Sequence, residues 1–286
     1  MATKNNAGPR AGQKTALITG AGIGGIGGAL ATELHEAGYF VICAVRRPST
    51  VEELLKKGMA HVEIDVASTE SVEAAAKTVA SLTNDKLDVL VNNAGVAVHR
   101  PALDLDVDGI VRTTFEVNVL GVMRVVKAFS ELLINAKGCI VNIGSSAPIA
   151  PLAFSSAYNA SKAAVHAYGD ALRMEMLPLG VDVVTVVTGG VKSNLVRETN
   201  PSLPDDSRYL GVEKFWRFRT IVSQHIGVPT DEYARKVVKM IQRKNKPIWF
   251  WAGGQSAFAW IMYYLVPKRL KLYIMARRFG LHLLKP

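Results

Sequence analysis

Tyr158 and Lys162 are the residues whose types and spacing point most directly to chemistry. They lie four positions apart at the start of residues 157–177, which have helical periodicity, so both side chains project from one face of the expected helix. A free phenol has a pKa near 10, and only about one in a thousand is ionised at neutral pH. One positive charge at ~4 Å, in an effective dielectric of ~20, contributes about 4 kcal/mol and lowers that pKa by roughly three units. The position of Lys162 therefore predicts that Tyr158 can act as a general acid and as a general base.

A glycine-rich segment, residues 19–28, follows the first expected strand and opens a helix. Glycines permit a tight turn and close approach of backbone to phosphate, and free N–H groups at the helix start attract the anion. Two overlapping patterns fit: Gly20, Gly22, Gly25 and Gly22, Gly24, Gly27. The helix register favours Gly20, Gly25 and Gly27, with Ile26 packing beside the cofactor. We expect a dinucleotide pyrophosphate here, and the alternative is a glycine-rich turn without a ligand.

The second expected strand ends at Arg46 and Arg47, where an NAD-selective site usually carries an acidic residue. Guanidinium groups match the geometry of a 2′-phosphate, so NADP(H) is the expected cofactor. The alternative is that both arginines lie on a solvated strand end. Asp65 and Val66 follow the third strand and are expected beside the adenine, although an Asp at a helix start is often a cap.

Further motifs occur in a fixed order along the chain: Asn92-Asn93-Ala94-Gly95 after the fourth strand, Asn118 in the next helix, and Ser145 thirteen residues before Tyr158. With the glycine segment, Tyr158 and Lys162, this set resembles the short-chain dehydrogenase/reductase family over residues 14–193. The resemblance implies hydride transfer between a nicotinamide cofactor and an alcohol or ketone carbon, with the oxidised nicotinamide also favouring the phenolate.

The resemblance also implies roles for individual residues. Ser145 would hydrogen-bond the substrate oxygen, Lys162 would hold the nicotinamide ribose, and Asn118 would position a water that links Lys162 to solvent. Ser146 is the alternative to Ser145, and the spacing to Tyr158 favours Ser145. The remaining cofactor contacts are expected from Asn92, Ala94, Gly95, Val191 and Ser193.

Residues 188–193 depart from the family pattern, because Thr188 replaces the usual Pro and Ser193 replaces the usual Thr. Ser193 keeps a hydroxyl for the carboxamide, whereas the backbone at Thr188 loses the rigidity of proline.

The elements expected to hold these residues are short β-branched apolar runs that alternate with helical segments. This alternation predicts a doubly wound Rossmann-type parallel sheet with helices on both faces. The six expected strands are residues 15–19, 40–45, 62–64, 89–91, 139–143 and 183–187, and the expected helices are 28–37, 71–82, 107–134 and 157–177. Residues 1–13 are expected to form a flexible leader, residues 14–245 the catalytic domain, residues 192–228 its lid, and residues 246–286 an apolar, basic helical extension.

Composition excludes several other classes of protein. Cys43 and Cys139 are too few for a disulfide scaffold and have no metal-ligand spacing with the six histidines, so no metal is expected, and an intracellular location follows. The net charge is +10, but twelve of the 34 Lys and Arg residues lie after residue 232, where there is no Asp or Glu. The rest of the chain is close to neutral, so a nucleic-acid partner is not expected.

The C-terminal segment contains nineteen consecutive uncharged residues, 248–266, flanked by lysines and arginines. Three alternatives stay open: association with a membrane surface, a membrane span, or a soluble lid or oligomer contact. Membrane association is favoured, on the cytoplasmic face of the endoplasmic reticulum or a lipid droplet, and suits a lipophilic ketone or alcohol substrate; the alternative location is the cytoplasm. Together with Arg46, Arg47 and residues 188–191, the segment resembles the acyl-dihydroxyacetone-phosphate reductase branch, steroid and retinol dehydrogenases, and fungal biosynthetic ketoreductases of polyketides or terpenoids.

Two other functions compete with that of a reductase. A nucleotide-bound scaffold would not need the complete set of Ser145, Tyr158, Lys162 and Asn118. A nucleotide-sugar epimerase or dehydratase would share the fold and Tyr158, but the apolar tail disfavours it. The resemblance also implies a homodimer or homotetramer, formed through the helices after Asn92 and Tyr158.

Overall fold

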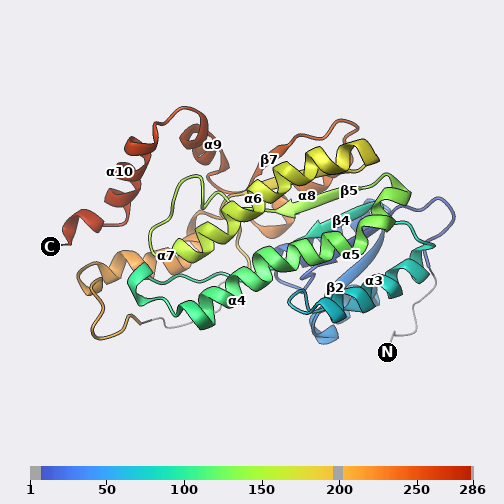
Figure 1. Cartoon of the computed structure of the whole chain (residues 1–286), viewed down its shortest axis with the longest axis horizontal. Helices are drawn as coiled ribbons and strands as arrows, with labels where there is room; N and C mark the ends of the chain where they lie inside the picture. Colours follow the sequence, from blue (N-terminus) through green and yellow to red (C-terminus); the bar gives the residue numbers. More distant parts are fainter. Residues whose placement is uncertain (1–7, 196–201, 285–286) are drawn as a thin grey trace.

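Seven parallel strands form one sheet in the computed structural model, which describes residues 8–195 and 202–284. Residues 1–7 of the predicted leader lie outside the described residues. The strand order is β3-β2-β1-β4-β5-β6-β7, which confirms the doubly wound Rossmann-type fold (Figure 1). The bounds are β1 Thr15–Thr19, β2 Phe40–Val45, β3 Ala60–Glu63, β4 Val89–Asn92, β5 Cys139–Ile143, β6 Asp182–Thr188 and β7 Trp249–Ala252. The first six coincide with the predicted strands to within two residues.

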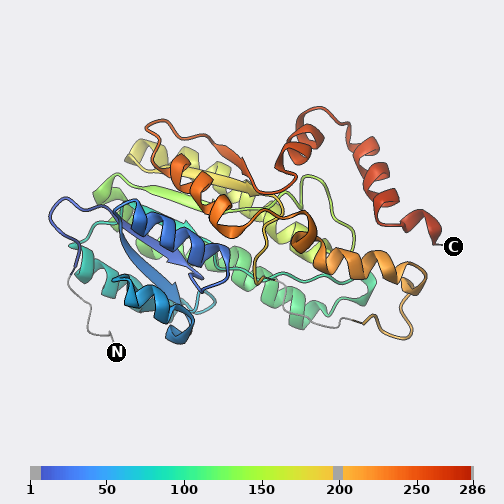
Figure 2. The same ribbon diagram turned by 180° about the vertical axis from the view of Figure 1, so that it is seen from behind.

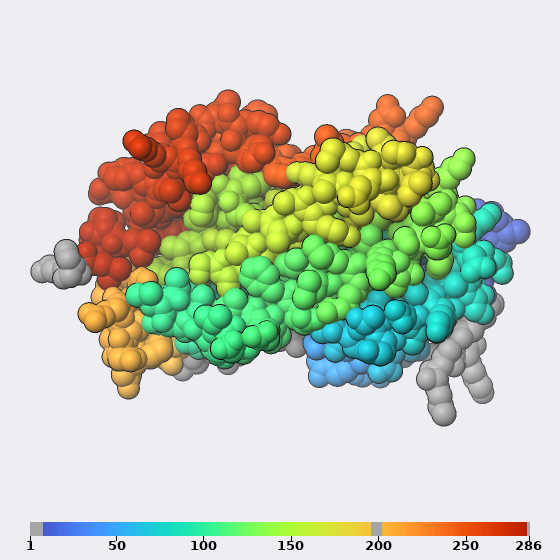
Figure 3. Space-filling model, viewed as in Figure 1, coloured from blue at the N-terminus to red at the C-terminus, as the bar shows by residue number. Residues whose placement is uncertain are grey.

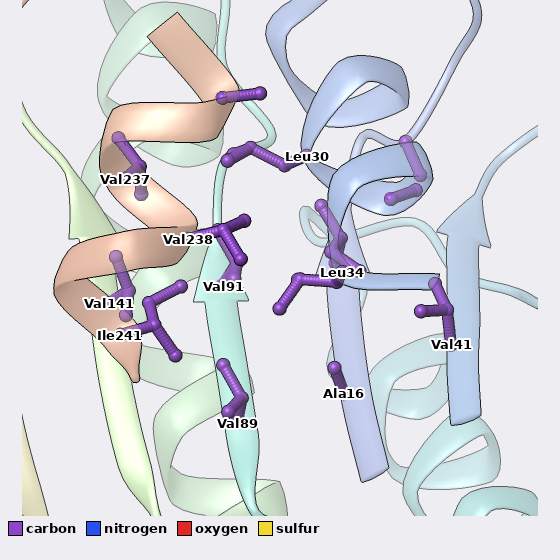
Figure 4. Close-up of a cluster of buried hydrophobic side chains, with 14 of the residues drawn as sticks. Ala16, Leu30, Leu34, Val41, Val89, Val91, Val141, Val237, Val238 and Ile241 are labelled. Atoms are coloured by element: carbon purple, nitrogen blue, oxygen red, sulfur yellow. The ribbon is translucent and has the colours of Figure 1, made fainter. Parts of the chain in front are cut away.

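Helices cover both faces of the sheet because both faces of its strands are apolar. On one face, α1 and α8 pack together, with Leu30 and Leu34 of α1 facing Val238 and Ile241 of α8 above the strands (Figures 2 and 4). On the other face lie α3, α5 and α6, packed through residues such as Phe129 (Figure 1). The bounds are α1 Ile26–Glu36, α2 Glu52–Lys56, α3 Thr69–Thr83, α4 Arg112–Phe115, α5 Gly121–Ala136, α6 Ser156–Met176, α7 Glu213–Ile226, α8 Thr230–Ile241, α9 Ser256–Tyr264 and α10 Lys268–Arg278.

The predicted long helix over residues 107–134 is present, but its hydrogen bonding is irregular. Two π-helical segments, Val107–Val111 and Glu116–Leu120, flank α4 and lead into α5. A π turn inserts an extra residue into the helical ladder and occurs often at functional sites. Here the second segment contains Asn118.

The C-terminal segment differs most from the prediction. β7 lies inside the uncharged run and pairs with β6, so the sheet continues beyond the predicted domain boundary at residue 245. Gly253 and Gly254 then end the strand, and α9 takes up only nine residues of the run. Within residues 8–195 and 202–284, no helix is long and apolar enough to cross a bilayer.

A separate cluster of buried side chains fixes α7, α9 and α10 to the body of the protein. Phe154, Trp216, Met262, Met275 and Phe279 are its main members. The last two helices lie at one end of the molecule, beside α7 (Figure 3). Part of the predicted lid is therefore the helix α7, which packs against the C-terminal helices, and residues 196–201 of that lid lie outside the described residues.

Candidate active site

A cavity of about 420 Å³ opens at the carboxyl ends of the strands. Its lining runs from the glycine loop after β1 to residues of α7, α9 and α10. The sheet order reverses between β1 and β4, and ligands bind parallel sheets at such a switch point. Most of the predicted site residues line this cavity: Gly20, Gly25, Ile26, Arg46, Arg47, Asp65, Val66, Ala94, Gly95, Ser145, Tyr158, Lys162, Val191 and Ser193.

The glycine loop is shaped by close contacts of its backbone. Gly20 has φ of +66°, which favours glycine, and a Cβ placed on it would lie 2.9 Å from Cα of Ala94. A Cβ on Gly27 would collide with the carbonyl oxygen of Gly20, so Gly27 packs behind the loop and does not line the cavity. Gly25 is the N-cap of α1 and brings no side chain to its first turn, which leaves the N–H groups there for an anion.

Asn93 and Thr19 hold the glycine loop against the end of β4. The Asn93 Nδ2 donates to the carbonyl oxygens of Thr19 and Gly20 at 2.9 and 3.0 Å, and the N–H groups of Asn93 and Ala94 donate to Thr19 Oγ1. Asn92 was the predicted cofactor residue, yet it is buried outside the main cavity and its Nδ2 donates to Asn142 on β5 at 2.9 Å. The lining residue is its neighbour Asn93.

At the other end of the loop, Arg46 and Arg47 are exposed and line the cavity directly after β2. Asp65 also lines it, while its Oδ1 accepts from the N–H of Ala67 at 3.0 Å. Asp65 therefore caps a turn, whereas the N-cap of α3 is Ser68, and its contact with adenine stays a prediction. Arg46, Arg47 and Asp65 line the end of the cavity at which a nucleotide is predicted, called the nucleotide end below.

Ser145, Tyr158 and Lys162 come together at the opposite end. Tyr158 and Lys162 are both buried on α6, one turn apart. The Lys162 Nζ donates to the carbonyl oxygen of Ile143 at 2.8 Å, which ties it to the end of β5. Ser145 follows that strand, and its N–H donates to Nε2 of the buried His166 at 3.1 Å. The three side chains are therefore positioned by β5 and α6.

Burial dominates the electrostatics of this cluster. It raises the pKa of Tyr158, while hydrogen bonding with Ser145 and the charge of Arg219 lower it. Burial lowers the pKa of Lys162 to about 8. Lys162 was expected to lower the pKa of Tyr158, and this effect stays a prediction; the positive charge that lowers it here is that of Arg219.

Comparisons with known proteins agree with this geometry. The family model described as short chain dehydrogenase matches residues 14–204. A short-chain dehydrogenase of Pyricularia oryzae is 39% identical over 274 residues, 94% of this chain and 95% of the relative.

This chain belongs to the short-chain dehydrogenase family.

Two further members show the range of related proteins. An NADPH-dependent 1-acyldihydroxyacetone phosphate reductase of Schizosaccharomyces pombe is 40% identical over 207 residues, covering 71% of this chain and 70% of the relative. The solved structure of a variant of actinorhodin polyketide ketoreductase with NADPH is 28% identical, has a TM-score of 0.68, and covers 82% of this chain and 92% of its own.

Asn118 lies behind the catalytic end of this short-chain dehydrogenase and does not line its main cavity. Its Oδ1 accepts from the N–H of Val96 at 2.8 Å, and its Nδ2 donates to the carbonyl oxygen of Val96 and to Ser161 Oγ. A Cβ on Gly95 would lie 3.2 Å from Asn118 Oδ1 and 3.8 Å from Lys162 Nζ, so both polar groups flank the same glycine. Asn118 thus fixes the loop after β4 beside Lys162.

Thr188 has partners that replace the rigidity of a proline. Its Oγ1 lies 2.7 Å from the hydroxyl of the buried Tyr233, and its carbonyl oxygen accepts from the N–H of Ser146 at 2.8 Å. The end of β6 is therefore tied both to α8 and to the loop that carries Ser145. Val191 and Ser193 follow it along the cavity wall.

His99 and Arg219 line the cavity and Trp216 holds His99, and none of the three was predicted from the sequence. The Trp216 Nε1 donates to the carbonyl oxygen of His99 at 2.7 Å, which holds α7 against the loop after β4. His99 Nδ1 lies 3.0 Å from Ser155 Oγ, and its ring meets that of Tyr158 edge-on. No local motif marks these residues, because the contacts join segments more than fifty residues apart.

Proposed function

We propose that this short-chain dehydrogenase is an NADPH-dependent reductase of a ketone on a lipophilic substrate, or oxidises the corresponding secondary alcohol. The observation that carries the proposal is one cavity lined by Arg46 and Arg47 at one end and by Ser145, Tyr158 and Lys162 at the other. Its intervening wall is the glycine loop, where Gly20, Gly22 and Gly25 line the cavity without side chains and the first N–H groups of α1 are suited to a pyrophosphate. The residues present therefore fit NADPH, which supplies the hydride when bound.

The chain's own residues would handle the substrate oxygen. Tyr158 donates its proton to the carbonyl oxygen during reduction and takes it back from the alcohol during oxidation. Ser145 Oγ donates a hydrogen bond to that oxygen and orients it toward the phenol. Lys162 is held by the Ile143 carbonyl and provides a positive charge at this end, where burial strengthens electrostatic interactions.

The apolar walls support a lipophilic substrate. Phe258, Ala259, Met275 and Phe279 line the cavity from α9 and α10. Lipid ketones and polyketides both fit these apolar walls. The similar NADPH-dependent 1-acyldihydroxyacetone phosphate reductase supports a lipid ketone. The similar polyketide ketoreductase supports a polyketide. A biosynthetic ketoreductase is therefore the second candidate.

The deciding experiment titrates the purified chain with NADPH and NADH while nicotinamide fluorescence is recorded. NADPH consumption is then followed with lipophilic ketones of the acyl-dihydroxyacetone-phosphate, steroid, retinoid and polyketide types. Tight NADPH binding with turnover of one class supports the reductase and identifies the substrate class. Binding of neither nucleotide would contradict the proposal, and binding without turnover of any ketone would favour the nucleotide-bound scaffold.

The outer surface of α9 and α10 supports docking on an anionic membrane surface. Trp260, Tyr264, Leu265 and Tyr273 are exposed there, at 43%, 56%, 66% and 58%. Lysines and arginines interrupt these apolar residues, and residues 246–286 contain no acidic residue. Aromatic and basic side chains together favour the interface of an anionic bilayer. We propose this face as the membrane contact through which an apolar substrate reaches the cavity; assembly into dimers or tetramers stays a prediction.

A further inference from the structure

Arg219 is a buried cation that has no ion-pair partner among residues 8–195 and 202–284. It lies on α7, is 5% exposed and lines the cavity. Its Nε has no hydrogen-bond partner, and among the ion pairs of residues 8–195 and 202–284 none involves Arg219. A guanidinium carries five N–H donors, and burying it unpaired is costly. Such a group calls for an anionic or strongly polar acceptor from outside the protein.

The position of Arg219 assigns it to the substrate end of the cavity. It lies one helical turn after Trp216, whose indole N–H is bonded to His99. The charge of Arg219 lowers the pKa of both Tyr158 and His99. Arg46 and Arg47, the proposed phosphate clamp, lie at the ends of a different strand and loop. Arg219 therefore faces the reacting group and not the adenosine.

Apolar side chains surround Arg219 in the cavity. Val222 and Ile226 follow Arg219 along α7, and Phe258, Met275 and Phe279 face the cavity from α9 and α10. Among the lining residues that the structure describes, Asp65 is the single carboxylate, and it lies at the nucleotide end. Burial lowers the pKa of Arg219 to about 10, so the group stays charged at neutral pH. The substrate end thus combines the buried positive charge of Arg219 with apolar walls, and Lys162 and Arg278 also line the cavity.

We propose that Arg219 binds an anionic oxygen of the substrate, carried by a carboxylate or a phosphate, while the substrate's apolar chain lies against α9 and α10. The assignment of that ligand as a substrate rests on the proposed reductase function. The anion site itself is a property of the folded chain and can be measured without turnover.

The test uses the full chain saturated with NADP⁺, so that the nucleotide blocks its own phosphate sites. Octyl phosphate, octanoate and octanol are titrated by calorimetry into wild type, Arg219→Met, Arg219→Lys and Arg217→Met. Arg217 is the matched control, since it lies on the same helix, pairs with Glu213 and does not line the cavity. The titrations are repeated without nucleotide, so that a failure to bind NADP⁺ is seen separately from a failure to bind the anion.

We expect wild type to bind an octyl anion in preference to octanol, and Arg219→Met to bind that anion about ten- to a hundred-fold more weakly, the loss typical of a charge-assisted hydrogen bond. Arg217→Met should bind it as wild type does, and Arg219→Lys should retain part of the affinity. Preference for octyl phosphate identifies a phosphate, and preference for octanoate a carboxylate.

Three results would overturn the proposal. Wild type could bind octanol as tightly as the octyl anions, Arg219→Met could lose as much affinity for octanol as for the anions, or Arg219→Met could lose as much affinity for NADP⁺ as for the anions. A thermal melt of Arg219→Met guards against misfolding. Removing an unpaired buried charge should leave its Tm unchanged or higher, whereas a large decrease would mean that the guanidinium is structural.

Discussion

His166 gives the protein a specific sensitivity to mild acid. Its ring is buried on α6, and Nε2 accepts the N–H of Ser145 at 3.1 Å, so the neutral imidazole holds the catalytic loop. Burial, aided by the charge of Lys162, lowers the pKa of His166 from 6.5 to about 4. Between these two pH values the unfolded chain binds more protons than the folded one. The free energy of unfolding therefore falls as the pH decreases from 6.5 toward 4.

The size of this effect follows from the two pKa values. At pH 5.0 the unfolded imidazole is almost fully protonated, whereas about nine-tenths of the folded groups are neutral. Proton linkage then removes about 2 kcal/mol of unfolding free energy between pH 7.5 and 5.0. The same direction holds for His99, whose pKa burial lowers to about 3. The free energy of unfolding of wild type should thus fall by at least about 2 kcal/mol between pH 7.5 and pH 5.0.

The assay is equilibrium unfolding in urea, followed by tryptophan fluorescence at pH 7.5 and 5.0. His166→Gln keeps an acceptor but does not titrate, so its decrease should be smaller than that of wild type by about 2 kcal/mol. His282→Gln, on an exposed side chain, should behave as wild type does. A wild-type stability that is equal at both pH values, or a His166→Gln variant with the wild-type dependence, would refute this account of the Ser145 loop.

Other substitutions test the rest of the site. Tyr158→Phe should bind NADPH normally and lose turnover by about a hundred-fold or more in a ketone-reduction assay, and near-wild-type rates would remove the proton donor from this mechanism. Replacing Arg46 and Arg47 together by Ala should weaken the binding of NADPH about ten-fold or more in fluorescence titrations and leave the binding of NADH unchanged. An equal loss of affinity for both nucleotides would exclude a 2′-phosphate clamp. Wild type should co-sediment with vesicles that contain phosphatidylserine, and the double variant Arg269→Glu, Lys271→Glu should remain in the supernatant. Equal sedimentation by neutral vesicles would argue against charge-driven docking.

The sequence predicted the sheet well where local signals are strong. Six strands are short, β-branched and bounded by turns or helices, so their order along the chain determines the parallel topology. β7 was missed because Trp249, Phe250 and Trp251 stand inside an uncharged run that is long enough to resemble a membrane segment. What makes those residues a strand is the open edge of β6, a tertiary partner that no local pattern reveals.

The two ends of the cavity also differ in how far the sequence predicts them. At the nucleotide end, function depends on backbone geometry: Gly20 and Gly25 permit close approach, and their spacing is visible in the sequence. At the substrate end, the walls exist only because α7 is held to His99 by Trp216 and because α9 and α10 pack on α7. Arg219 has no motif around it, and its importance lies in being buried with no hydrogen-bond partner for its Nε in the part of the chain that the structure describes. Substitutions on α9 and α10 should therefore change the substrate while leaving nucleotide binding intact, whereas α7 also reaches the predicted cofactor segment, where Gln224 donates to the carbonyl oxygen of Ser193 at 2.9 Å.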